Sequence, residues 1–223
     1  MHKIQALRAL AAAAALAVVG AGAHAEGILT VSSYDTVNGD GQASGGEYNY
    51  WDTSYSGSGA TTTDGLAGSV LTGGSGKLTD NVVSHDAWYD VSNAAGTGPY
   101  VGWREDPTIT FHFAGNQSID DLKLAVDNTD VGGVSSPQSI IVNGTTYSDP
   151  SWLTVSGNTK IIDLNNLGIH GDSVTVTLVR SNEWVFVSEA QFFSTAVPEP
   201  ASGALLLAGL GLVGALARRR KLG

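Results

Sequence analysis

Hydrophobic and polar residues alternate one by one along several short stretches of this chain. The clearest stretches are 108–113, 122–126 and 173–179. In the first, Ile109, Phe111 and Phe113 fall on one face, with threonine and histidine between them. Side chains of a strand point alternately to its two faces, so this pattern is typical of half-buried antiparallel strands. The pattern therefore predicts a sheet with one apolar and one polar face.

Several shorter segments fit the same description. Residues 139–147 read as a hairpin, because Asn143-Gly144 supplies the positive φ angles that a tight turn needs. No part of the body shows a sustained apolar stripe of helical period, and the Gly/Ser/Thr-rich stretch 54–76 indicates loops. The sequence therefore predicts an all-β fold, an antiparallel β-sandwich over residues 26–197. Further strands are predicted at 29–34, 48–51, 88–91, 153–156, 160–164, 185–187 and 190–193.

The first 25 residues have the pattern of a secretory signal peptide. Basic residues near the start are followed by an apolar stretch at 9–19, and Ala23-His24-Ala25 forms a cleavage step before Glu26. An N-terminal membrane anchor is the alternative, but the apolar stretch is short for a bilayer core of ~30 Å. We therefore expect a signal helix at 1–25 and export through the Sec translocon.

The C-terminal segment combines an apolar run with a basic end. Residues 201–217 carry no charge, and their length lies at the lower limit for a transmembrane helix. A buried core helix is the alternative, although such a helix rarely ends in adjacent cations at a chain terminus. Positive charge stays on the cytoplasmic side, so we expect a transmembrane helix with the body of the protein outside. The basic cluster consists of Arg218, Arg219, Arg220 and Lys221.

Pro198-Glu199-Pro200 precedes this helix. The two prolines fix an extended segment that is poor in hydrogen bonds and open to an enzyme. The motif, helix and basic cluster together make residues 198–223 resemble the PEP-CTERM sorting signal of exported Gram-negative proteins. The resemblance implies processing of the tail by an exosortase, after transient anchoring in the inner membrane. It also implies a destination at the cell surface or in the extracellular matrix of exopolysaccharide and biofilm producers.

Composition narrows the possible partners of the body. Residues 26–197 include five basic and twenty acidic residues, an excess of fifteen negative charges. Such a surface repels nucleic acid and anionic lipid, whereas it is compatible with calcium and with neutral sugars. The chain has no cysteine, so disulfides do not stabilise it outside the cell. The body is long enough for one domain with its own core.

The order of segments in the body adds a second resemblance. The step 77–80 (KLTD) is followed by Trp88, the strand 108–113 and a final segment 184–193 (WVFVSEAQFF). This order resembles the galactose-binding-like jelly roll of discoidin-type modules, over residues 65–194. Asn81 stands where that family usually has glycine, and Ala190 where it has valine or isoleucine. The resemblance implies a jelly-roll sandwich with a binding role.

Calcium has two candidate places. The jelly-roll resemblance implies a structural Ca²⁺ between Asp80 and Glu189, with help from oxygens of 81–86, and hard oxygen donors suit that ion. The alternative is that Asp80 caps a turn and Glu189 pairs with a base. Residues 36–47 match the spacing of an EF-hand loop, but position 1 is Thr36 and no helices are predicted on either side. A simple turn between strands is the favoured interpretation there.

Sugar binding needs an aromatic platform and directed polar groups. Near predicted loops, the sequence offers four candidate ligand-binding residues, Trp51, Tyr100, Trp103 and Arg104. Core packing is the alternative for any aromatic residue, and it is the favoured interpretation for Trp88, Trp152 and Trp184.

Catalysis is not expected. The chain lacks cysteine and a nucleophile-elbow serine, and its acidic pairs at 105–106, 120–121 and 127/130 read as turn caps and solvated charge. The leading hypothesis is an exported, surface-sorted, non-catalytic protein that binds carbohydrate or extracellular matrix. The alternatives are a structural surface protein without a glycan ligand and a small polysaccharide hydrolase, which would need two carboxylates across a cleft.

Overall fold

The structure is a computed structural model that describes residues 25–62 and 68–197. The chain divides into two compact units, and Ile28–Thr195 forms the larger one. The predicted signal peptide, the motif 198–200, the helix 201–217 and the basic cluster lie outside the described residues. Within the described ranges, no helix is long and apolar enough to cross a membrane.

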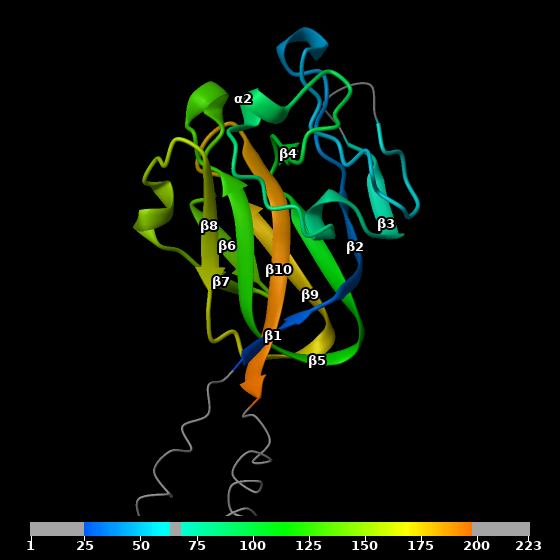
Figure 1. Ribbon diagram of the computed structural model, residues 1–223, viewed down its shortest axis with the longest axis vertical. Helices are drawn as coiled ribbons and strands as arrows, with labels where there is room; N and C mark the ends of the chain where they lie inside the picture. Colours follow the sequence, from blue (N-terminus) through cyan, green and yellow to red (C-terminus); the bar gives the residue numbers. More distant parts are fainter. Residues whose placement is uncertain (1–24, 63–67, 198–223) are drawn as a thin grey trace, which may run out of the picture. The chain divides into compact units, whose positions relative to one another are not determined.

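Ile28–Thr195 is built almost entirely of antiparallel strands in two layers (Figure 1). One layer holds β3 (Val70–Gly74), β2 (Val31–Val37), the first half of β5 (Thr108–Asp127), β9 (Ile169–Val179), β6 (Ser139–Val142) and β7 (Thr145–Tyr147). The other holds β8 (Thr159–Leu164), the second half of β5, β10 (Val185–Val197) and β4 (Val101–Trp103). The strand β1 (Ala25–Leu29) lies beside β10 in the sheet order.

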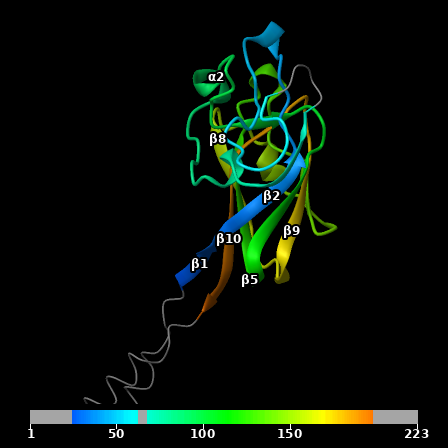
Figure 2. The ribbon, with the colours of Figure 1, turned by 90° about the vertical axis from the view of Figure 1, so that its right-hand side faces the viewer.

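The long strand β5 belongs to both layers. Its first half pairs with β2 and its second half with β8 and β10, and the pairing with β9 breaks between His112 and Gln117. Gly115 lies in this break with φ of 139°, a conformation that glycine adopts without a side-chain clash. Figure 2 shows the result, with β8 and β10 on one side and β9 on the other.

The core lies between the two layers and follows from the alternation in the sequence. Ile109, Phe111 and Phe113 are buried on the inner face of β5, while the residues between them are partly or fully exposed. A second cluster lies apart from this core and is mostly aromatic. It consists of Tyr50, Trp88, Tyr100, Val134, Trp184 and Phe186.

The predicted fold class is confirmed, and so is the hairpin. Asn143 and Gly144 both have positive φ, 46° and 85°, between the paired strands β6 and β7. The predicted strand 29–34 is divided at Thr30 between β1 and β2. The two predicted strands 185–187 and 190–193 are one strand, β10, with a register shift between Val187 and Glu189.

Three predicted strands are wrong. Residues 88–91 form the helix α2 (Trp88–Val91), because the Asp127 carboxylate accepts a hydrogen bond from the Trp88 N–H (2.8 Å) and satisfies the first turn. Residues 153–156 begin with the last residue of η4 (Pro150–Leu153), which Asp149 caps, and continue without a strand. Residues 48–51 form no strand, only a bridge from Tyr48 to Ala43. The remaining short helices are η1 (Ser44–Gly46), η2 (Lys77–Thr79) and η3 (Val131–Gly133).

Candidate functional site

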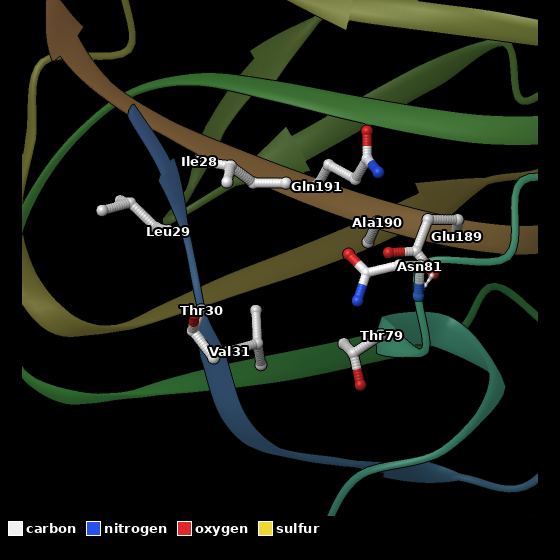
Figure 3. Close-up of a pocket in the computed structure, with 9 residues that line it drawn as sticks. All are labelled: Ile28, Leu29, Thr30, Val31, Thr79, Asn81, Glu189, Ala190 and Gln191. Carbon is white, nitrogen blue, oxygen red and sulfur yellow. Dashed lines mark hydrogen bonds between the residues drawn. The ribbon is translucent and has the colours of Figure 1, made fainter. Parts of the chain in front are cut away.

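The structure brings Asp80 and Glu189 together, although 109 positions separate them in the chain. Asp80 follows η2, and Glu189 lies on β10 beside it. The backbone N–H of Asn81 donates to Glu189 Oε2 at 3.1 Å, and Figure 3 shows this contact. Asn81 has φ of 65°, a left-handed conformation that asparagine and glycine tolerate best, which explains why asparagine can replace the family's glycine. The predicted proximity of the two carboxylates is therefore present.

The environment of Glu189 is unfavourable for an isolated negative charge. The residue is only 2% exposed. Burial, followed by the nearby Asp80 charge, raises the pKa of Glu189 to about 8, although hydrogen bonds from the Asn81 and Asp80 backbones act in the opposite direction. Partial burial also raises the pKa of Asp80, whose Oδ1 accepts from the Val82 N–H at 2.8 Å. The nearby buried Lys77 acts on the Asp80 carboxylate in the direction of a lower pKa, and a bound cation would further favour the ionised form of both carboxylates.

A bulge in β10 brings Glu189 to this position. The register against β5 shifts between Val187 and Glu189, and Ser188, Glu189 and Ala190 are all buried in succession. A bulge re-aims side chains in this way. A cavity of about 90 Å³ adjoins the site. Its lining is Ile28, Leu29, Thr30, Val31, Thr79, Asn81, Glu189, Ala190 and Gln191 (Figure 3).

The donor set fits a hard cation rather than a transition metal. In the part of the chain that the structure describes, no group of three or more histidine, cysteine, aspartate or glutamate side chains converges on one point. Ca²⁺ does not need such a group, because it takes six to eight oxygens that include carbonyls, hydroxyls and water. The two carboxylates and the oxygens of the adjacent 81–86 segment are donors of this kind.

The EF-hand-like segment 36–47 is a turn, as the sequence interpretation favoured. Its first two residues are the end of β2, and the three-residue η1 lies further along it. Its potential ligands already have protein partners. Asn38 Oδ1 accepts from the Asp52 N–H at 2.7 Å, and Asp40 Oδ2 accepts from the Arg104 N–H at 2.7 Å.

The aromatic residues predicted to bind a ligand are buried. Trp51, Tyr100 and Trp103 are 7%, 1% and 2% exposed. Trp103 Nε1 donates to the Val37 carbonyl at 2.7 Å, and the Tyr100 hydroxyl donates to the Asp86 carbonyl at 2.7 Å. None of these three rings has an open face on which a sugar could stack. Their predicted binding role would need an exposure that this structure does not give them.

Arg104 differs from these rings because its side chain is 37% exposed. Its guanidinium lies 4.7 Å from the centre of the Trp184 ring, a cation–π contact, and it forms an ion pair with Glu183. These contacts fix the orientation of the guanidinium at the surface. Arg104 is therefore the predicted ligand residue that the structure leaves accessible.

Sequence reasoning placed Tyr89 near a predicted loop but did not choose it as a ligand-binding residue. Tyr89 is 41% exposed on α2, and its ring packs edge-on against Trp88 at 5.6 Å. Ring contacts continue from Trp88 to Tyr50 at 6.0 Å and from Tyr50 to Trp184 at 5.2 Å, where Arg104 stacks. We call these five residues the aromatic strip. The sequence did carry one signal for the exposure of Tyr89. Neighbouring residues of a strand point to opposite faces, so the strand predicted at 88–91 with Trp88 in the core would already have turned Tyr89 toward solvent.

The acidic pairs considered for hydrolysis have structural partners. Asp106 Oδ1 accepts from Arg180 Nε at 3.1 Å, and Asp121 Oδ1 accepts from the Asn166 N–H at 3.2 Å. Asp127 holds Trp88 and Thr129, while Asp130 Oδ1 accepts from Asn182 Nδ2 at 3.1 Å. These hydrogen bonds indicate that Asp106, Asp121, Asp127 and Asp130 help to stabilise the fold.

Comparison with known proteins gives one family match, to the PEP-CTERM protein-sorting motif over residues 196–221. No curated protein matches the chain. Among solved structures, it is similar to truncated AlyQ with CBM32 and alginate lyase domains (14% identity, 78% of this chain and 35% of that chain covered, TM-score 0.41). It is also similar to the family 32 CBM of C. perfringens NanJ in complex with galactose (8% identity, 53% of this chain and 82% of that chain covered, TM-score 0.34). It covers only 23% of the SpGH29 chain (12% identity, 53% of this chain covered, TM-score 0.34).

Proposed function

We propose that this chain is an exported, surface-sorted, non-catalytic protein whose β-sandwich binds carbohydrate or extracellular matrix through the aromatic strip. The observation that supports the proposal most directly is the arrangement of Tyr89 and Arg104. Both are accessible, and both rest on a buried network of aromatic rings. The order of segments that resembles galactose-binding-like modules points to the same role.

Tyr89 has the properties of a stacking platform. A sugar ring offers its C–H face to an aromatic ring, and about two-fifths of Tyr89 is open to solvent. The supporting Trp88 is fixed at both ends, because its N–H donates to Asp127 and its Nε1 donates to the Val131 carbonyl at 3.1 Å. A platform held this firmly loses little conformational entropy when a ligand binds.

Arg104 supplies directed hydrogen-bond donors at the other end of the strip. A guanidinium has five N–H donors in a fixed plane, and stacking on Trp184 sets the direction of that plane. Sugar hydroxyls accept such bonds, and the surrounding negative charge favours neutral rather than acidic sugars. The strip therefore combines an apolar surface with polar donors, as carbohydrate recognition requires.

The proposal is tested by the retention of the full-length chain on the exopolysaccharide of the producing cell. We expect saturable retention, with a loss of roughly tenfold for Tyr89→Ala, by analogy with the ~1–3 kcal/mol that one nucleic-acid base contributes when it stacks on an aromatic ring. Arg104→Gln should weaken binding, and Lys123→Gln is its matched control, because Lys123 makes a surface ion pair with Asp163 away from the aromatic strip. A protein that shows no saturable retention would instead be a structural surface protein.

For the carboxylate pair we propose a structural Ca²⁺ held by Asp80 and Glu189. The ion would supply the positive charge that two crowded carboxylates lack, and it would tie η2 to β10. For the C-terminal segment we propose that an exosortase-type enzyme processes the tail after transient anchoring, and that the mature protein reaches the cell surface in an exopolysaccharide or biofilm setting. The match to the sorting motif supports this localisation.

A further inference from the structure

A second surface feature lies away from the aromatic strip, where β2 meets β3 and β5. It is an open depression of about 750 Å³ in which every lining side chain is polar. Ser33 and Asp35 come from β2, His112 from β5, and Thr72 from β3. The remaining lining residues are Ser56, Gly57, Ser58 and Gly73. We call this feature the hydroxyl depression. Figure 1 shows β3 beside β2 at the edge of the sandwich.

Two of the residues that line the hydroxyl depression, His112 and Asp35, are in direct contact. His112 Nε2 and Asp35 Oδ2 are 2.9 Å apart, and Asp35 Oδ1 accepts from the Gly73 N–H at 2.8 Å. Both side chains remain accessible, at 37% and 40% exposure. Each carboxylate oxygen keeps further lone-pair capacity, and among the described residues no protein atom hydrogen-bonds His112 Nδ1. The pair thus offers oriented donor and acceptor positions to solvent.

Backbone hydrogen bonds hold the Ser58 and Thr72 part of the lining in place. The backbones of Ser58 and Thr72 exchange two hydrogen bonds, at 2.9 and 3.0 Å. Gly57 allows this close approach, since a Cβ there would lie 2.4 Å from the Thr72 carbonyl oxygen. These backbone contacts fix one part of the lining, at Gly57, Ser58 and Thr72, and that part is formed before any ligand arrives.

Hydroxyl groups continue beyond the depression on the same outer face. Along β5 the side chains of Thr110 and His112 share this face, and their partners on β9 are Thr175 and Ser173. Thr110 Oγ1 and Thr175 Oγ1 are 3.2 Å apart. A ligand with several sugar units could therefore leave the depression across a polar surface rather than an apolar one.

We propose that the hydroxyl depression is a second binding site for a neutral saccharide, in which Asp35 and His112 contact the ligand. Serine and threonine hydroxyls, a carboxylate and an imidazole are groups that hydrogen-bond to a polyhydroxylated ligand, so this site would hold a saccharide by directed polar contacts alone, without the stacking platform that the aromatic strip offers. The Asp35 carboxylate and the acidic chain disfavour sugars that carry carboxylates. This site goes beyond the aromatic strip, and it would let one chain contact a polysaccharide at two places.

The test uses full-length protein in detergent with isotope-labelled histidine, so that each imidazole is observed by nuclear magnetic resonance. The probes are lactose, cellobiose, maltose, mannobiose and chitobiose at millimolar concentration, with digalacturonate as the anionic comparison. We expect at least one neutral disaccharide to shift the His112 ring signals saturably and to leave His170 unchanged. Asp35→Asn and His112→Gln should each weaken that binding at least tenfold, whereas His170→Gln, an exposed histidine on β9, should not.

The Tyr89→Ala variant distinguishes binding at the hydroxyl depression from binding at the aromatic strip. If the hydroxyl depression binds independently, the His112 response to the disaccharide persists in that variant. The proposal is overturned if no neutral disaccharide moves the His112 signals, or if digalacturonate moves them equally. In either case, retention on polysaccharide that depends on Tyr89 would leave the proposed function intact. Conversely, a His112 response without retention through Tyr89 would support this site alone.

Discussion

The backbone N–H of Asn81 donates to the buried carboxylate of Glu189, 108 residues further along the chain, at 3.1 Å. This bond joins the turn after η2 to the bulge of β10. It places Asp80 close enough for its charge to act on Glu189, whose pKa is raised to about 8. The contact therefore links two segments that are distant in sequence, and it lies beside the two carboxylates of the proposed calcium site.

Calcium should raise the melting temperature of the protein. A ligand that binds only the folded state at 100 times its dissociation constant adds ~2.7 kcal/mol, which corresponds to several degrees for a domain of this size. Chelator should reverse the shift. Glu189→Gln keeps the shape but removes a charged ligand, so it should abolish the response, while Asp163→Asn at a surface ion pair with Lys123 should keep it. An unchanged melting midpoint with calcium would rule the site out.

Much of the fold could be predicted from the sequence because burial on one face of a strand leaves a simple alternating pattern. The same pattern could not identify α2, since four residues are too few to show a helical period and the carboxylate that caps them, Asp127, lies far away in sequence. The proximity of Asp80 and Glu189 came from the family resemblance, because no spacing rule relates residues on different strands. Aromatic exposure could not be predicted either. Trp103 and Tyr89 both lie near loops, and only tertiary packing decides which is covered.

Trp103→Phe should test whether Trp103 stabilises the fold or binds a ligand. The indole Nε1 donates to the carbonyl of Val37 at the end of β2, and Trp103 is 2% exposed. Phenylalanine keeps an apolar ring but is smaller and cannot make this hydrogen bond, so the free energy of unfolding should fall by ~1–3 kcal/mol. Chemical denaturation measures this loss.

Retention of the Trp103→Phe variant on the producer's exopolysaccharide, measured where the variant is fully folded, should equal that of the wild type. A large loss of retention with unchanged stability would restore the role that the sequence suggested for this residue.

Lys77 should give the protein an unusual stability gain at alkaline pH. Its side chain is 5% exposed, and Nζ donates to the Trp51 and Gly96 carbonyls at 2.6 Å each. Burial lowers the pKa of Lys77 from 10.5 to about 8, so in the folded state the amine loses its proton earlier than in the unfolded state. Between pH 8 and 10.5 the unfolded state binds more protons, and stability therefore rises with pH by at most ~1.4 kcal/mol per unit.

The measurement is urea unfolding across this pH range for the wild type and for Lys77→Met, which has no titrating amine. Other groups titrate in both proteins, so the informative quantity is the difference in unfolding free energy. The unfolding free energy of the wild type should rise relative to that of the variant as the pH rises from 8 to 10.5. A difference that stays constant would show that Lys77 keeps its ordinary pKa.

Changing Pro198, Glu199 and Pro200 to alanine should prevent processing of the tail. From the sequence, the two prolines are expected to keep this segment extended and separate from the apolar run that follows, and alanine would allow a helix to continue through it. In the producing cell, we expect wild-type protein at the surface to lack the residues after the motif, as intact mass would show. The triple variant should keep its full C-terminus and stay in the membrane fraction, whereas Pro150→Ala in the body should be processed normally. Surface protein that still extends to Gly223 in the wild type would contradict processing at this motif.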